Sequence, residues 1–234
     1  SCIPQSYLDR PLLRTSIPRH CQDIPPKRRH FPRRGRRNRY GISGIDEVQT
    51  RCYYTNLITM VEIKLVTKQA ELEGVLALQQ ANLRKNITQE EAETEGFLMA
   101  EYDLDFLELL NQKSPGIIAK DGEKVVGYSL VALPETARQH PLLADLVQNI
   151  ERCIFEGKPV ENYAIVAQLC VSKEYRGQDL VQKLYGSFRD HYANRYTYCV
   201  TDVAQANHRS LKAHQKRGFQ VIRRLISIES MRCN

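Results

Sequence analysis

The chain has 234 residues, of which 42% are hydrophobic and 26% are charged, and its formal net charge is +7. This length suffices for one well-buried domain and is short for two. The positive charge is uneven, because residues 1–59 carry 12 Lys and Arg against 4 Asp and Glu, whereas residues 60–234 carry 22 against 23. We therefore expect a basic tail over 1–59 and one nearly neutral globular domain over 60–234.

The seven cysteines are an odd number and form no Cys-x-x-Cys pair. They indicate neither a disulfide framework nor a zinc site, so no metal is expected. No apolar run approaches the length of a membrane span, and no signal-peptide pattern is present. These features favour a cytoplasmic protein in a reducing setting, without a membrane partner.

Residues 1–59 include the basic run KRRHFPRRGRRNRY and six of the ten prolines. Such a composition buries too little apolar surface to offset the chain entropy, so we expect the tail to be disordered. It is open to three interpretations: an arm that binds nucleic acid or the ribosome, an Arg-rich targeting segment, or a segment that is no native part of the protein. The third is favoured because the first methionine is Met60, directly before a regular strand. A chain that starts at Met60 should then fold with an unchanged melting temperature.

From Met60 onward, hydrophobic periodicity predicts regular elements. Alternation of apolar and polar residues predicts a first strand over 61–65. Helices are expected over 69–84, from Thr88, over 103–110 and over 141–155. Two strands, over 116–119 and 124–133, flank Asp121-Gly122, a dipeptide typical of a hairpin turn.

The stretch Tyr163 to Phe219 carries the most specific pattern. An apolar strand, 163–171, runs into the polar loop SKEYRGQ and then into an amphipathic helix that begins at Leu180. A second strand, 196–203, leads to a helix from Asn207 to Gly218, and a last strand is expected over 220–228. A strand, a turn with a cation and a glycine, and a helix together present unpaired backbone N–H groups to a phosphate.

The spacing Arg-x-x-Asp-x-Val at 176–181 resembles the signature Arg/Gln-x-x-Gly-x-Gly/Ala of the GNAT superfamily of acetyl-CoA-dependent N-acyltransferases. Asn207, His214 and Gly218-Phe219 resemble the family's later Asn, Tyr and Gly-Phe. The sequence departs from the family at three positions: Asp179 for Gly, Val181 for Gly or Ala, and His214 for Tyr.

The resemblance extends from about residue 61 to the C-terminus. It implies an α/β (α+β) GNAT fold, with a central mixed, mostly antiparallel sheet of about six to seven strands flanked by helices. It also implies an N-acetyltransferase that moves an acetyl group from acetyl-CoA to a primary amine by direct attack in a ternary complex.

The resemblance further implies which residues hold acetyl-CoA. The end of the strand over 163–171 would pair with the pantetheine arm, and the N–H groups of 177–182 would hold the pyrophosphate. Asn207 would bond the arm and would also cap its own helix. The acidic Asp179 should weaken this binding, and Arg176 should offset part of the repulsion. The expected cofactor-binding residues are Leu169, Cys170, Val171, Arg176, Gly177, Gln178, Asp179, Leu180, Val181, Gln182 and Asn207.

Two residues are candidates for proton transfer. Asp202 lies five residues before Asn207 on an otherwise apolar strand, where relatives place a general base; a salt-bridged strand-end acid is the alternative. His214 stands where the family has a tyrosine that protonates the leaving thiolate, and a structural histidine is the alternative. Gln168 would orient substrate or water, and an acyl-enzyme on Cys170 is not favoured because no histidine partner is evident.

Eight acids and no Lys or Arg lie between Asn86 and Gln112. This region borders the acceptor cleft in the family, so it predicts a cationic acceptor, either a small-molecule or a peptide amine; an ordinary solvated helix face is the alternative. Two other functions stay open: a non-catalytic acyl-CoA sensor, and a protein associated with nucleic acid or the ribosome through its basic tail. The sequence does not distinguish a monomer from a homodimer.

Overall fold

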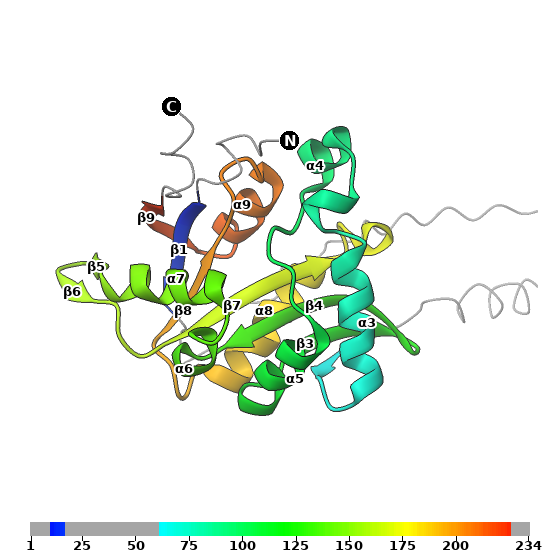
Figure 1. Cartoon of the computed structure of the whole chain (residues 1–234), viewed down its shortest axis with the longest axis horizontal. Coiled ribbons are helices and arrows are strands. Elements are labelled where there is room, and N and C mark those ends of the chain that lie inside the picture. The colour runs from blue at the N-terminus through cyan, green and yellow to red at the C-terminus, as the bar shows by residue number, and fades with distance from the viewer. Residues whose placement is uncertain (1–9, 17–60, 226–234) are drawn as a thin grey trace, which may run out of the picture. The chain divides into compact units, whose positions relative to one another are not determined.

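The computed structural model describes residues 10–16 and 61–225 (Figure 1). The strands are β1 (Arg10–Ser16), β2 (Glu62–Leu65), β3 (Ile117–Asp121), β4 (Lys124–Ala132), β5 (Ile154–Phe155), β6 (Lys158–Pro159), β7 (Tyr163–Val171), β8 (Tyr198–Asp202) and β9 (Gln220–Leu225). The helices are α3 (Gln69–Gln80), α4 (Gln89–Glu95), α5 (Leu104–Lys113), α6 (Pro134–Ala137), α7 (Pro141–Glu151), α8 (Leu180–Tyr192) and α9 (His208–Gln215), with short 3₁₀ turns at Arg84–Asn86 and Lys173–Tyr175.

Seven of these strands form one sheet in the order β2-β3-β4-β7-β8-β1-β9. Neighbouring strands are antiparallel except β7 and β8, which run parallel. The predicted mixed, mostly antiparallel sheet flanked by helices is thereby confirmed.

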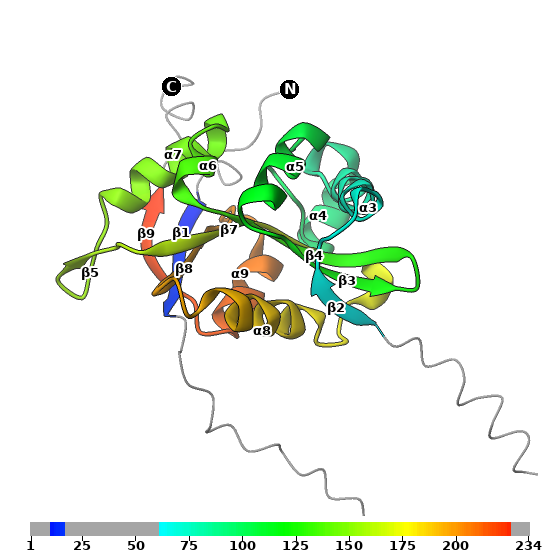
Figure 2. The same cartoon turned by 90° about the horizontal axis from the view of Figure 1, so that it is seen from below.

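Helices cover both faces of the sheet. Leu72 and Val75 of α3, Leu107 of α5 and Leu146 of α7 belong to one buried cluster, and Leu184 of α8 belongs to the cluster on the other face. Figure 2 shows α8 below the sheet and α3, α5 and α7 above it. With apolar helices on both faces, the central strands are buried on both sides.

The expectation that all of residues 1–59 stay outside the fold is wrong for Arg10–Ser16. This segment is a strand, β1, that lies between β8 and β9 and pairs with both. Leu12 and Leu13 are both 0% exposed, and each belongs to the buried cluster of a different face. The two leucines are too short an apolar signal to stand out in a basic, proline-rich segment. The predictions for residues 1–9 and 17–59 lie outside the described residues.

The region between β4 and β7 also differs from prediction. The helix expected over 141–155 ends at Glu151, and a β5–β6 hairpin follows. Glu156 and Gly157 both have positive φ, which a tight hairpin turn requires. Ile154, which the predicted helix would have included, is instead 64% exposed in the hairpin. The prediction ran past the true end of the helix because Ile154 lies four residues after Ile150, the spacing of an apolar helix face.

Several local predictions are confirmed. Thr88 caps α4 by accepting a hydrogen bond from the Glu91 N–H, and Glu91 bonds back to the Thr88 N–H. The Asp121-Gly122 turn joins β3 to β4, and Gly122 has φ +58°. Gly218, after α9, has φ +83°, as expected for a glycine that ends a helix.

Candidate functional site

β7 and β8 begin side by side and then separate. Their parallel pairing ends where Ile165 lies opposite Val200, whereas β7 continues to Val171. Against β4, the register of β7 shifts so that Ala167 has no counterpart. An extra residue of this kind bends the strand that carries it. The sheet consequently opens between the last part of β7 and the end of β8.

The backbone of Leu169 and Val171 faces this opening. The Ser172 N–H donates to the Val126 carbonyl oxygen of β4 at 2.8 Å, and hydrogen-bonded pairs of an antiparallel ladder recur at every second residue. The backbone groups of Cys170 therefore point toward β4, and those of Leu169 and Val171 point the other way. A chain-like ligand in the opening would meet the N–H groups of Leu169 and Val171.

The thiol of Cys170 is unsuited to covalent catalysis. Its side chain is buried, and burial raises its pKa to about 12. A thiol with so high a pKa stays protonated at neutral pH, and the thiolate is the nucleophilic form. An acyl-enzyme on Cys170 is accordingly not supported.

The loop between β7 and α8 turns through two left-handed residues. Gly177 has φ +79° and Asp179 has φ +58°. Asp179 precedes α8 without capping it through its side chain, so the first N–H groups of α8 lie at an open helix N-terminus. Aspartate, asparagine and glycine tolerate the left-handed conformation better than other residues, which explains why Asp can stand where the family has Gly.

Residues 177–182, here called the phosphate loop after their predicted role, include two glutamines whose side chains turn elsewhere. Gln178 donates to the Glu174 carbonyl oxygen at 3.2 Å, and Gln182 accepts from Arg217 at 2.9 Å. Any contact that they make with a phosphate would come from their backbone.

The Arg176 guanidinium is held by the protein itself. Its Nε donates to the Val171 carbonyl oxygen at 3.1 Å, its Nη2 donates to Asn82 Oδ1 at 3.1 Å, and its Nη1 forms an ion pair with Glu95. The side chain is 15% exposed. Arg176 therefore anchors the loop to β7 and to the segment after α3, a role that the sequence did not suggest.

A row of cations on α9 and at its C-terminal cap was missed in the sequence. Arg209, Lys212 and Lys216 line the pocket beside the phosphate loop, together with Arg217. The first three are spaced i, i+3, i+7, which places them on one face of the helix. This spacing was the available signal, and these side chains suit an anionic ligand at the loop.

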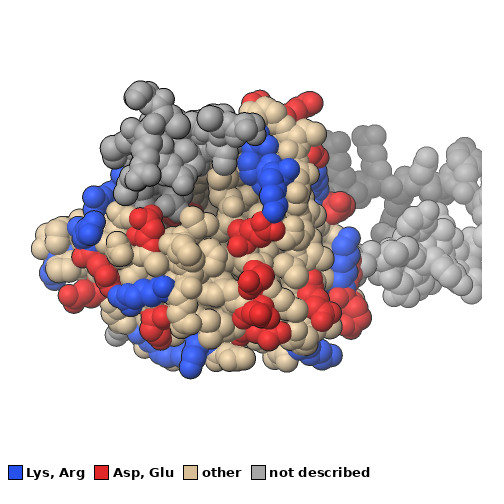
Figure 3. Space-filling model, in the orientation of Figure 1, with Lys and Arg blue, Asp and Glu red and all other residues tan. Residues whose placement is uncertain are grey.

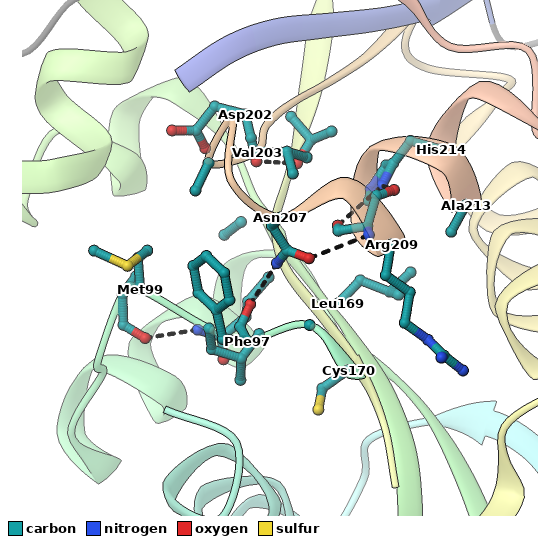
Figure 4. A pocket seen from close by; sticks show the side chains of 18 of the residues that line it. Phe97, Met99, Leu169, Cys170, Asp202, Val203, Asn207, Arg209, Ala213 and His214 are labelled. Carbon is teal, nitrogen blue, oxygen red and sulfur yellow. Dashed lines mark hydrogen bonds between the residues drawn. The ribbon is translucent and has the colours of Figure 1, made fainter. Parts of the chain in front are cut away.

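Asp202 and His214 approach the pocket from different elements. Asp202 lies at the end of β8, opposite Leu12 of β1, and is partly buried. His214 lies on α9 and is 4% exposed. Figure 4 shows the two on opposite sides of Asn207. Both line the same pocket, but they do not contact one another in the view.

The ring of His214 is neutral in its resting state. Nδ1 lies 2.8 Å from the Ser210 carbonyl oxygen, which can only accept, so Nδ1 carries the hydrogen. Burial lowers the pKa of His214. Nε2 is buried and has no hydrogen-bond partner among the described residues. His214 therefore offers a lone pair, and it must first gain a proton before it can donate one from Nε2.

Asn207 and Gln168 hold the segment that precedes α5. Asn207 caps α9 through Oδ1, and its Nδ2 donates to the Phe97 carbonyl oxygen at 2.8 Å (Figure 4). Gln168 accepts from the Tyr128 hydroxyl at 2.6 Å and donates to the Ala100 carbonyl oxygen at 2.7 Å. The capping role predicted for Asn207 is confirmed, while its bond to a pantetheine arm stays a prediction.

The run of acids between Asn86 and Gln112 mostly points away from the pocket. Only Glu95 among the eight lines it. Others form surface ion pairs, such as Glu91 with Lys173 and Glu101 with Lys85. Figure 3 shows acidic side chains gathered over α5 and α3, interspersed with basic ones. The solvated-face interpretation thus accounts for most of the run.

The end of β7, the phosphate loop, α7 and α9 line an open pocket of about 1250 Å³, which extends from the phosphate loop to α7. At the α7 end, charges of both signs line it: Asp145, Asp202, Arg152, Arg223 and Arg224. Within residues 10–16 and 61–225, no three His, Cys, Asp or Glu side chains gather in a metal-binding arrangement. No helix in those ranges has the length and apolarity to cross a membrane.

The chain is similar to several solved structures at low sequence identity. The GNAT-family N-acetyltransferase YhbS from Escherichia coli, in complex with CoA, is 19% identical over 56% of this chain and 54% of that one, with a TM-score of 0.33. The aminoglycoside 6'-N-acetyltransferase AAC(6')-Ih from Acinetobacter baumannii is 16% identical over 72% and 96%, with a TM-score of 0.49. The ribosomal-protein-alanine N-acetyltransferase from Brucella melitensis is 20% identical over 67% and 83%, with a TM-score of 0.43. The chain thus spans about half the length of the first of these.

No curated protein matches the chain. The sequence model described as the acetyltransferase (GNAT) family matches residues 81–219, more than half of the chain. That range contains β7, the phosphate loop, α8, β8 and α9, the elements that form the site. The chain therefore belongs to the acetyltransferase (GNAT) family.

Proposed function

We propose that this acyltransferase moves an acetyl group from acetyl-CoA to a primary amine, with both substrates bound together. The observation that carries the proposal is the pairing of two backbone features in one pocket. The N–H groups of Leu169 and Val171 face the opening of the sheet, and the left-handed loop at Gly177 and Asp179 leads into the open N-terminus of α8.

The residues present suit a CoA thioester. The end of β7 can bond an extended, amide-bearing arm as a strand would, and the first N–H groups of α8 can hold a pyrophosphate. Lys212 and Lys216 add positive charge beside them. Such a thioester supplies an acyl group that is activated toward nitrogen.

Transfer then needs an oxyanion site and two proton movements. A β7 N–H that faces the opening stabilises the carbonyl oxygen as negative charge develops on it. Asp202 accepts the proton that the amine nitrogen loses as the new C–N bond forms, and the C–S bond then breaks. His214 is neutral at rest, so its Nε2 first takes up a proton from water and then gives it to the thiolate sulfur; the lowered pKa of His214 makes its protonated form the stronger acid.

The acceptor enters from the α7 end of the pocket in this proposal. Asp145 and Asp202 favour an amine there, while Arg152, Arg223 and Arg224 suit an anionic group on the same molecule. Some solved relatives are named for aminoglycosides or for a ribosomal-protein alanine. A small-molecule or peptide amine is the acceptor class that we propose.

A panel of amines with acetyl-CoA, followed by release of free thiol, tests the proposal. The panel includes polyamines, aminoglycosides, amino acids and peptides with a free N-terminus. Thiol release that depends on one class of amine supports the enzyme. Tight binding of acetyl-CoA by calorimetry without release on any amine would instead favour the acyl-CoA sensor.

A further inference from the structure

Glu95, the last residue of α4, lies between two arginines from different parts of the site. It forms an ion pair with Arg176 Nη1, and Arg209 Nη1 of α9 lies 3.6 Å from its Oε2. The hydrogen bond from Arg176 and the charge of Arg209 lower the pKa of the Glu95 carboxyl. The Glu95 carboxylate thus connects three parts of the site: α4, Arg176 directly before the phosphate loop, and the cationic face of α9.

The chain that follows Glu95 forms a wall of the pocket. Residues 95–100, here called the wall segment, all line it. At Gly96, where φ is +79°, an added Cβ would lie 2.9 Å from Asn207 Oδ1, so the wall segment passes α9 too closely for a larger residue. At its far end, Gln168 of β7 bonds the Ala100 carbonyl oxygen.

The phosphate loop reaches the wall segment through Arg176. Arg176 directly precedes Gly177, and it bonds both Val171 and Asn82 in addition to Glu95. Leu98 donates to the Asn82 carbonyl oxygen at 2.9 Å, so Asn82 contacts the loop and the wall segment alike. A ligand that immobilises the loop would restrain Arg176, and through it Glu95 and the wall segment.

We infer that Glu95 is a positioning residue that couples occupancy of the phosphate loop to the placement of the wall segment. This inference rests on the proposed function, since it requires that the loop bind the pyrophosphate of CoA. The wall segment extends from the loop toward Gln168 and the acceptor end. Binding of the acyl donor would therefore order one side of the amine site before transfer.

Hydrogen exchange with and without CoA tests the coupling in the full chain. In the wild type, CoA should slow exchange of the amides of the wall segment by about fivefold or more, the lower end of typical coupling between sites. Glu95→Gln should still bind CoA but lose most of this slowing. Glu93→Gln is the matched control, because Glu93 lies two residues before Glu95 in α4, is exposed and, among the described residues, bonds only Gln89; it should behave as the wild type.

The outcomes separate the inference from its premise. If Glu95→Gln keeps the full slowing by CoA, the coupling does not pass through Glu95 and the inference is overturned. The same holds if Glu95→Gln exchanges faster by one factor with and without CoA, which is what a purely structural ion pair predicts. If the wild type binds CoA without any slowing, the inference alone fails. If it binds no CoA in calorimetry, the proposed function fails and takes the inference with it.

Discussion

The His214 Nδ1–H donates to the Ser210 carbonyl oxygen across one turn of α9, at 2.8 Å. This bond fixes the tautomer and turns the lone pair of Nε2 away from its own helix backbone. The ring is enclosed by Tyr185 and Phe219, with centroid distances of 5.8 and 5.2 Å. The pocket histidine is consequently held neutral by an apolar surrounding.

We expect His214 to make the fold sensitive to mild acid. Its folded pKa lies below the ordinary value of about 6.5. As the pH falls through that value, the unfolded chain takes up a proton that the folded chain resists, so stability present above pH 6.5 is lost below it. His214→Phe should therefore lose less melting temperature than the wild type between pH 7.5 and pH 5.

Thermal denaturation over this pH range checks the expectation. His191→Phe is the matched control, because His191 makes the same 2.8 Å bond to the carbonyl four residues earlier but is exposed on α8. Equal acid sensitivity of the wild type and His214→Phe would contradict the argument.

Substitutions of Asp202 and of His214 should lower turnover in different ways. Asp202→Asn keeps the shape but cannot accept a proton, so turnover should fall by about 10²–10⁴-fold, and less at high pH where more of the amine is already deprotonated. His214→Phe should lower turnover with little change in acetyl-CoA affinity, and His214→Tyr should retain more activity than His214→Phe. Rates against pH, with calorimetry on each variant, measure both effects. Near-normal turnover in both Asp202→Asn and His214→Phe would remove these two residues from the chemistry.

Asp179→Gly should tighten acetyl-CoA binding several-fold. The substitution removes a like charge near the proposed phosphate position, worth on the order of 1 kcal/mol for an exposed group. It also favours the left-handed backbone at φ +58°. Asp179→Asn separates the two effects, since asparagine tolerates this conformation but has no charge. Unchanged affinity in both variants, measured by calorimetry, would show that the carboxylate lies away from the ligand.

β1 should be required for full stability. Leu12 and Leu13 are fully buried, and Leu→Ala at such positions costs about 2–5 kcal/mol. A chain that starts at Met60 should accordingly melt at a lower temperature, contrary to the expectation from composition. Leu142→Ala, at a position 43% exposed, is the control and should change the melting temperature little. A Met60 start that melts with the wild type would show that β1 does not contribute in solution.

Most of the fold could be predicted because its periodic segments are long. β7 is a long apolar run, and α8 repeats apolar residues at helical spacing, so the sequence indicates both the type of each element and the residues that it buries. β1 could not be predicted, because its burial depends on strands far away in sequence. The β5–β6 hairpin was missed because its turn residues, Glu156 and Gly157, carry only a weak local signal.

The site was predictable where family spacing fixes a backbone position and less so for side chains. The loop at Gly177 and the cap at Asn207 lie where expected. The sequence did not predict the partners of Arg176, because Asn82 and Glu95 come close to it only in the tertiary fold. The neutral state of His214 likewise follows from burial, which no local pattern of charges reveals.

β1 pairs with two strands that lie far away in the sequence. During synthesis Arg10–Ser16 leaves the ribosome long before its partners, β8 and β9. The sheet can close only after β9 has emerged, and such non-local pairings slow folding because a long loop must be closed first. Until then β8 has an unpaired edge next to a half-formed core, so this edge is where a nascent chain would be most prone to pair with a neighbour.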